Sequence, residues 1–302
     1  MGGGSWSKSS YVDYASKSGR AVDLNTTKLA GDYSAQELFV NRSLDEALNI
    51  FNKIRECCDS DEHPNTIPVI LALDVTGSMG AASVEVAKSL SPIMSRLYEK
   101  APDIQFMIMA IGDVAYDHYP LQVSQFEADI RIAEQLDKVY FEGRGGGNSY
   151  ESYTAAWWYA VNRCKLDCWN RGKKGILITM GDESLNPYIP GGNFTNVVGK
   201  MNMQERMEDI QTKDLYPQVC EKYEVYHISV NSPYSSYGRN APDIERTWNK
   251  TLGERAMVST IEDLEDTIVN IVLNHVNDEP SAIGVNEPVS EDIPATSGFI
   301  SW

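Results

Sequence analysis

Three oxygen-bearing side chains alternate along a short stretch of the sequence: Asp74, Thr76 and Ser78. They directly follow an apolar run at residues 67–73, which is typical of a buried strand. Because alternate side chains of an extended segment point to the same side, one carboxylate and two hydroxyls can converge on one point. Oxygen ligands of this kind suit a hard divalent cation such as Mg²⁺ or Mn²⁺. The spacing therefore predicts a cation site just after this strand.

Two further loops carry oxygen-bearing residues next to buried segments. Residues 142–151 have the sequence EGRGGGNSYE and lead into a nearly continuous apolar stretch at residues 155–164. Residues 179–184 have the sequence TMGDES, and they form an acidic exit from an apolar run at residues 175–180. In open α/β sheets, ligands bind outside the carboxyl ends of the strands. We expect these loops to meet the first one at that edge.

The apolar pattern predicts strands that alternate with helices. Continuous apolar runs, typical of strands buried on both faces, occupy residues 67–73, 104–111, 175–180 and 225–230, with a weaker one at 255–259. Helical patterns cover residues 86–97, 155–164, 203–210 and 264–272. Pro92 should kink or restart the first of these helices. This order predicts an α/β fold with a doubly wound, mostly parallel open sheet and helices on both faces.

The composition divides the chain into three parts. Residues 1–64 are expected to form an N-terminal arm, which either wraps the body or is mobile, and a short helix at residues 43–55 with a capping box of Ser43 and Glu46. Residues 65–276 hold the α/β pattern. Residues 277–302 contain acidic residues and three prolines but no Lys or Arg, which predicts an acidic, disordered tail.

Together, these motifs resemble the von Willebrand factor type A (vWA) domain and its metal-ion-dependent adhesion site (MIDAS). The first motif of that family, Asp-x-Ser/Thr-x-Ser, is matched by Asp74, Thr76 and Ser78. The family also has an Asp ligand at the end of its fourth strand, and Asp182 matches it. The resemblance covers roughly residues 65–276 and implies a vWA fold.

The resemblance also implies a ligand from the loop before the third helix, where the family often has Thr or Asp. Asn148 takes this place because it directly follows the glycines. It is a departure from the family pattern, since Asn offers a neutral carbonyl oxygen. Ser149 and Glu151 are alternatives for the same position. The ligand set implied for the cation is therefore Asp74, Thr76, Ser78, Asn148 and Asp182.

The function implied by the resemblance is metal-dependent protein–protein interaction. The cation would be Mg²⁺, with Mn²⁺ or Ca²⁺ as alternatives, and its open coordination position would take an Asp or Glu of a partner protein. Arg144 and Arg239 are candidates for the rim of such a surface. Intracellular members of the family often work beside an AAA+ ATPase or within a multi-protein assembly, which suggests similar partners here.

Composition excludes several other classes of function. The 302 residues include 26 Lys and Arg against 43 Asp and Glu, a net charge of −17 that repels nucleic acid and anionic lipid. No apolar stretch approaches the ~20 residues needed to span a bilayer. Five cysteines, an odd number, and a start without a secretory signal favour a reduced cytoplasm, in a prokaryote or a phage.

Enzymatic alternatives fit the residues less well. A haloacid dehalogenase-like, Mg²⁺-dependent phosphatase would use Asp74 as nucleophile, but Thr76 stands where a second Asp usually acts as acid and base. A serine hydrolase would need Gly at position 76. A vWA scaffold without a metal ion is the third alternative, in which Asp74 and Ser78 only cap the next helix. His227 lies in a strand pattern and is expected to be a hydrogen-bonded core residue.

Overall fold

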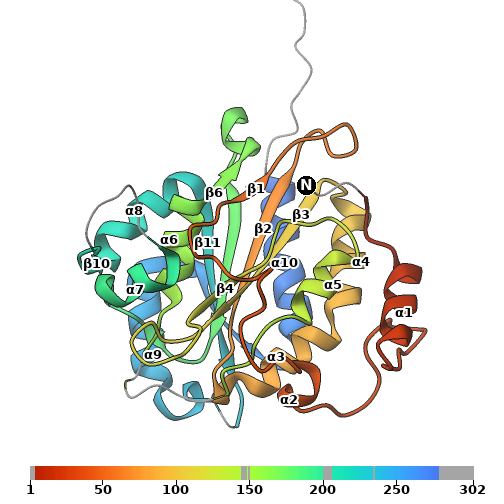
Figure 1. The fold of residues 1–302 in the computed structure, drawn as a ribbon, viewed down its shortest axis with the longest axis horizontal. Helices are drawn as coiled ribbons and strands as arrows, with labels where there is room; N and C mark the ends of the chain where they lie inside the picture. The colour runs from red at the N-terminus through yellow and green to blue at the C-terminus, as the bar shows by residue number, and fades with distance from the viewer. Residues whose placement is uncertain (1–3, 144–147, 149, 200–205, 234, 279–302) are drawn as a thin grey trace, which may run out of the picture.

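The fold is built on a six-stranded, mostly parallel sheet (Figure 1). The computed structural model describes residues 4–143, 148, 150–199, 206–233 and 235–278. Across the sheet the strands are β12 (Ala256–Thr260), β11 (Tyr223–Asn231), β7 (Gly175–Gly181), β2 (Ile67–Asp74), β3 (Ile104–Ile111) and β4 (Leu121–Val123). Only β4 runs antiparallel to its neighbour. The first strand of this sheet along the chain, β2, lies in the middle. Strands β3 and β4 follow on one side of it, and β7, β11 and β12 then follow on the other side.

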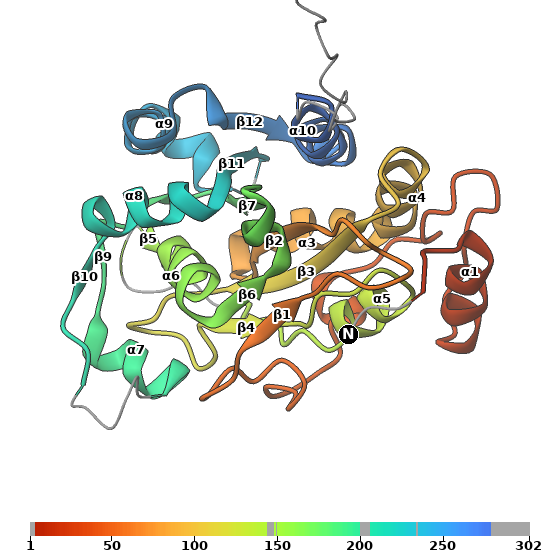
Figure 2. The same cartoon turned by 90° about the horizontal axis from the view of Figure 1, so that it is seen from above.

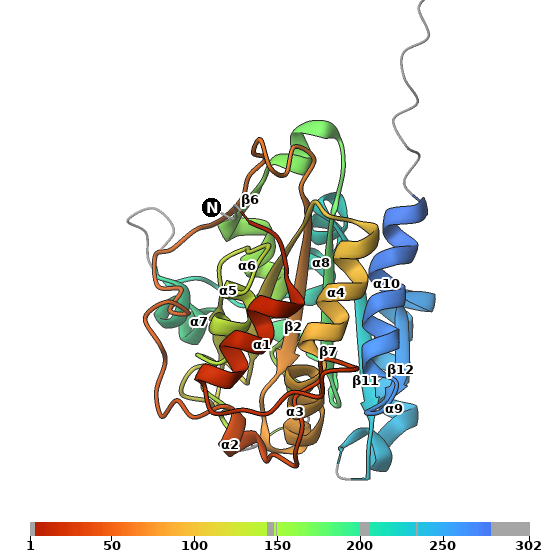
Figure 3. The ribbon, with the colours of Figure 1, turned by 90° about the vertical axis from the view of Figure 1, so that its right-hand side faces the viewer.

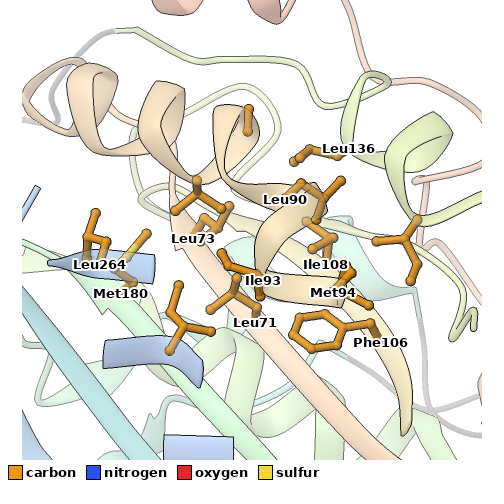
Figure 4. Close-up of a cluster of buried hydrophobic side chains, with 14 of the residues drawn as sticks. Leu71, Leu73, Leu90, Ile93, Met94, Phe106, Ile108, Leu136, Met180 and Leu264 are labelled. Atoms are coloured by element: carbon orange, nitrogen blue, oxygen red, sulfur yellow. The ribbon is translucent and has the colours of Figure 1, made fainter. Parts of the chain in front are cut away.

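Helices cover both faces of the sheet (Figure 2), so its inner strands are mostly apolar. One face packs on α3 (Gly80–Lys88), α4 (Leu90–Lys100), α5 (Arg131–Leu136) and α10 (Leu264–Asp278). The other face packs on α6 (Tyr153–Arg163), α7 (Gly191–Val198), α8 (Thr212–Lys222) and α9 (Tyr237–Leu252). Alternation along β2 divides the two cores: Leu71 and Leu73 face α4 and α10 (Figure 4), and Ile70 and Ala72 face α6.

The predicted α/β fold with a mostly parallel sheet flanked by helices is confirmed. All five predicted strands are present, and short β4 at the edge was not predicted. Smaller pairs of strands flank the sheet: β1 (Arg55–Cys57) with β6 (Cys164–Leu166), β5 (Tyr150–Glu151) with β8 (Ser184–Leu185), and β9 (Tyr188–Ile189) with β10 (Ile210–Gln211). Among the described residues, no helix is both long and apolar enough to cross a membrane.

The N-terminal segment wraps the body (Figure 3), one of the two arrangements expected for it. It contains a helix that was not predicted, α1 (Lys8–Lys17), which packs near α4. Tyr11 and Ala15 of α1 are buried in the same core as the sheet. The Arg20 guanidinium forms an ion pair with the Asp137 carboxylate at 2.7 Å. The segment therefore contributes to the core.

The prediction of a short helix at residues 43–55 was wrong. This segment forms turns and then strand β1. The Asp45 carboxylate accepts a hydrogen bond from the Ala47 backbone N–H, and the Asn49 side chain accepts one from Phe51 N–H. Such local side-chain bonds compete with helix formation. The capping box lies earlier, at Ser34 and Glu37, before α2 (Ala35–Leu38).

The other helical predictions have different outcomes. The pattern at residues 86–97 is divided between α3 and α4, and Pro92 lies in the first turn of α4, where it restarts the helix as expected. At residues 203–210, Met203 is outside the described residues, while Ile210 pairs with Ile189 in a small sheet instead of a helix. The last helix, α10, continues to Asp278, two residues into the range predicted as tail, and residues 279–302 are outside the described part.

Candidate cation site

Strands β2 and β7 bring Asp74 and Asp182 to the same edge of the sheet, the lower end in Figure 1. The two strands are adjacent and parallel, with Leu73 beside Met180, so their next residues leave the sheet at one place. Asp74 ends β2, and Asp182 directly follows β7. Both side chains are completely buried. The structure thus brings together two of the predicted ligands, from segments more than a hundred residues apart.

Asp74 is held by three hydrogen bonds. One carboxylate oxygen accepts from the Thr76 backbone N–H at 2.8 Å and from the Thr76 hydroxyl at 2.6 Å. The other oxygen accepts from the Tyr153 hydroxyl at 3.1 Å. Thr76, itself buried, is therefore oriented by Asp74 as the alternating spacing predicted.

Asp182 is joined to the first loop by Ser78. The Ser78 hydroxyl donates to one oxygen of Asp182 at 3.1 Å, and the backbone N–H of Ser236 donates to the other at 2.5 Å. Ser236 lies in the loop after β11, so a third strand end contributes to the site. Four of the five predicted ligand residues thus meet at one edge of the sheet as two hydrogen-bonded pairs, Asp74 with Thr76 and Asp182 with Ser78.

The two carboxyl groups lie in a strongly unfavourable environment for negative charge. Burial, and then repulsion from Asp182, raises the pKa of Asp74 to about 8. Burial also raises the pKa of Asp182, although Ser236, Ser78 and the charge of Arg239 act in the opposite direction. Among the described residues, neither carboxylate has an ion pair with Lys or Arg. Arg239, predicted for the rim, is exposed and provides partial compensation.

The glycine-rich loop places Glu151, and not Asn148, next to this cluster. Asn148 is exposed, its amide N–H donates to Asp113 at 2.6 Å, and its amide oxygen accepts from Tyr150 N–H. Glu151 is buried, and its pKa is raised to about 11 by burial and then by the charge of Asp74. Its Oε2 atom is buried and has no hydrogen-bond partner among the described residues. Ser149 lies outside the described residues.

Tyr153 was missed by the sequence analysis because it begins an apolar helix. Its hydroxyl donates to Asp74 and accepts from the Glu183 backbone N–H at 3.3 Å, so it bridges the two strand ends. Gly181 makes room for it, since a Cβ atom at position 181 would lie 2.0 Å from the Tyr153 hydroxyl oxygen. The glycine just before Asp182 is the sequence signal that could have indicated this close approach.

The donor set fits a hard divalent cation. Within the described residues, no three His, Cys, Asp or Glu side chains are grouped to hold a metal ion. The cluster instead combines carboxylates with two hydroxyls, which are ligands that Mg²⁺ and Mn²⁺ accept. Buried carboxyl groups are expensive unless they are neutralised, by a proton or by a cation. The Glu151 oxygen adds one more acceptor, for which the part of the chain that the structure describes supplies no donor.

His227 and the cysteines are separate from this cluster of carboxyl groups. His227 is completely buried, stacks on Trp248 with ring centroids 3.5 Å apart, and lies 3.0 Å from the Thr179 hydroxyl, as a core residue should. Burial lowers its pKa well below the usual range, so it is neutral. All five cysteines are unbridged, and three of them are buried.

No protein-family model and no curated protein matches the sequence. Among solved structures, the open conformation of the pilus adhesin SpaC from Lactobacillus rhamnosus GG has a TM-score of 0.44 at 9% identity, over 74% of this chain. A second form of SpaC has a TM-score of 0.46 at 11% identity, over 85% of this chain. This chain spans about a third of the adhesin, 31% and 36% in the two forms.

Proximal thread matrix protein 1 from the mussel byssus is also similar, with a TM-score of 0.45 at 11% identity. The similarity covers 72% of this chain and 49% of the matrix protein. At these values, the likenesses carry no conclusion about what this chain does.

Proposed function

We propose that this chain is a vWA-type, metal-dependent protein-binding module, with its cation site at the carboxyl ends of β2 and β7. The observation that carries the proposal is the cluster of Asp74 and Asp182 with Thr76 and Ser78, in which both carboxyl groups are buried and neither has an ion pair with Lys or Arg among the described residues. The strand order, with β2 in the middle and β4 antiparallel at one edge, agrees with the fold that the sequence motifs imply.

The protein residues would have distinct roles at this site. The Thr76 and Ser78 hydroxyls and the two carboxylates would hold Mg²⁺ or Mn²⁺, which supplies a Lewis-acidic position for an oxygen of another molecule. Glu151 takes the second-loop place that the resemblance assigns to Asn148, because it is buried beside Asp74. Tyr153 and the Ser236 N–H hold the carboxylates in place. An exposed Asp or Glu of a partner protein is the ligand that such a position would bind.

A binding role fits these residues better than hydrolysis. Thr76 occupies the place where a phosphatase of the haloacid dehalogenase type has its acid and base, and its hydroxyl is engaged with Asp74. An AAA+ ATPase or a larger assembly is proposed as the setting by analogy with the family alone.

The proposal is tested by calorimetric titration of Mg²⁺ and Mn²⁺ into the wild type, Asp74→Asn and, as a control, Asp13→Asn at an exposed position of α1. Saturable binding that Asp74→Asn abolishes and Asp13→Asn retains would support the site. No binding to the wild type would leave a scaffold without a metal ion. Turnover of p-nitrophenyl phosphate by the wild type with Mg²⁺, lost in Asp74→Asn, would instead indicate the phosphatase.

A further inference from the structure

A small hollow lies beside the candidate cation site, between the loop after β3 and the loop that contains β9. It has a volume of about 260 Å³ and is lined by residues that include Asp113, Tyr116, Asn148, Tyr150, Asn186 and Tyr188. This is smaller than the roughly 300–1,000 Å³ typical of pockets for drug-sized ligands. The hollow is therefore of a size for one side chain. We call it the tyrosine hollow.

Aromatic side chains are concentrated at this hollow. Tyr116, Tyr150 and Tyr188 are 58%, 38% and 44% exposed, and they are the three exposed tyrosines among the described residues. All three line the same hollow. Exposed tyrosines are typical of binding surfaces, because they offer a large ring face with little loss of conformational entropy.

The charge of the hollow is negative. Asp113 is the one charged residue among the described residues that line it. The Asp113 carboxylate accepts hydrogen bonds from the Asn148 side chain at 2.6 Å and from the Ala115 N–H at 2.7 Å. Both donors are neutral, so its charge is not compensated by them. Asp117, which lies close enough to interact electrostatically with Asp113, adds to the negative potential.

Ring faces together with a carboxylate are the combination that binds organic cations. We infer that the tyrosine hollow takes the guanidinium or ammonium group of an arginine or lysine side chain from a protein partner. A guanidinium group can stack on a tyrosine ring and also donate to Asp113. A partner with a basic segment is also favoured by the net charge of −17.

The hollow and the candidate cation site share strand β5. Tyr150 of β5 is exposed at the hollow, and the next residue, Glu151, is buried beside Asp74. A partner segment could therefore place an acidic side chain at the cation and a basic one in the hollow. The idea that one partner supplies both side chains rests on the proposed function. Binding of a basic side chain in the tyrosine hollow does not rest on it.

The test uses small probes, in EDTA, so that the result is independent of the cation site. Ligand-observed NMR would measure binding of Nα-acetyl-arginine methylamide and of its neutral isostere, Nα-acetyl-citrulline methylamide. The variants are Asp113→Asn and Tyr188→Ala, with Phe51→Ala as the control. Phe51 is an equally exposed aromatic residue, at 49%, outside the hollow.

We expect saturable binding of the arginine probe and at least about tenfold weaker binding of the citrulline probe, since a charge-assisted hydrogen bond is lost. Asp113→Asn should weaken arginine binding by about tenfold, and Tyr188→Ala by about threefold. Phe51→Ala should leave it unchanged.

Equal binding of the two probes, or arginine binding that is insensitive to both hollow variants, would overturn the inference. Failure of the cation site would show separately, as the absence of Mg²⁺ binding in calorimetry.

Discussion

At the scale of single residues, the site brings buried carboxyl groups together, and burial disfavours their negatively charged form. Asp74, Asp182 and Glu151 are each buried, and each has a raised pKa because of that burial. The hydrogen bonds from Thr76, Ser78 and Tyr153 offset only part of this cost. We therefore expect the residues proposed to hold a cation to destabilise the protein when no cation is bound.

Asp74→Asn should reveal this cost directly. Asn keeps an oxygen to accept from Thr76 but cannot ionise, so it removes the buried charge of Asp74 and its repulsion with Asp182. In EDTA at pH 8.5, we expect a gain of about 1–3 kcal/mol in the free energy of unfolding. Thermal or urea denaturation measures it. A loss of stability in EDTA would mean that the negative charge of Asp74 itself supports the fold.

Gly181→Ala should disturb the site through Tyr153. The added Cβ atom would lie 2.0 Å from the Tyr153 hydroxyl oxygen, so the ring must move away from Asp74. We expect a destabilisation of about 1–3 kcal/mol in urea denaturation, together with weaker Mg²⁺ binding. Gly192→Ala in α7 is the matched control, because nothing lies within 4 Å of its added Cβ. Equal stability of the two variants would contradict the packing described here.

At the scale of elements, the N-terminal segment tests whether a sequence without clear periodicity contributes to the core. Tyr11 of α1 is 3% exposed and belongs to the core of the sheet. Tyr11→Ala should therefore cost about 3 kcal/mol in the free energy of unfolding. Leu24→Ala, at a position that is 77% exposed, should change little. If Tyr11→Ala also changes little, the segment does not pack on the domain in solution.

The elements show why some parts of the fold were predictable and others were not. The inner strands β2, β3 and β7 are apolar on both faces, so continuous apolar runs identify them without knowledge of the tertiary structure. Helix α1 was missed because it buries only Tyr11 and Ala15, which is too few for a periodic signal. The segment at residues 43–55 was mistaken for a helix because Asp45 and Asn49 bind the backbone locally, an effect that hydrophobic spacing does not reveal.

The candidate site, like the fold, could be predicted from the sequence only in part. Asp74, Thr76, Ser78 and Asp182 come from strand ends, and strand adjacency brings them together. The glycine-rich loop has no such constraint. Asn148 binds Asp113 there, while pairing of β5 with β8 fixes Glu151 at the buried position. Tyr153 depends on the space at Gly181; the glycine indicates a close approach in the sequence, but it does not identify the side chain that makes it.

At the scale of the whole molecule, the raised pKa values link stability to pH. Protonation of Asp74 and Asp182 stabilises the folded state fully below the unfolded pKa of about 4. That stability is lost as the pH rises through the folded values, near 8 for Asp74, while Glu151 keeps its proton to about 11. In EDTA, the melting temperature should fall between pH 5 and pH 9 by several degrees, a window set by these values.

Mg²⁺ should stabilise the molecule more at high pH than at low pH, because protons and the cation compete for the same oxygens. Differential scanning fluorimetry with Mg²⁺ and with EDTA, across the same pH range, measures the difference. In Asp74→Asn, this difference should disappear. A stabilisation by Mg²⁺ that is independent of pH would indicate binding elsewhere on the acidic surface.

If a divalent cation replaces protons in this buried cluster, its binding releases protons, and that release can be measured. Mg²⁺ would be titrated calorimetrically into the wild type at pH 7, in two buffers that differ in their enthalpy of ionisation. We expect saturable binding of Mg²⁺, with a heat that depends on the buffer and corresponds to release of about one proton or more. Protons are released because the ligands must be deprotonated to bind a metal. Binding without proton release, or no binding in either buffer, would contradict this expectation.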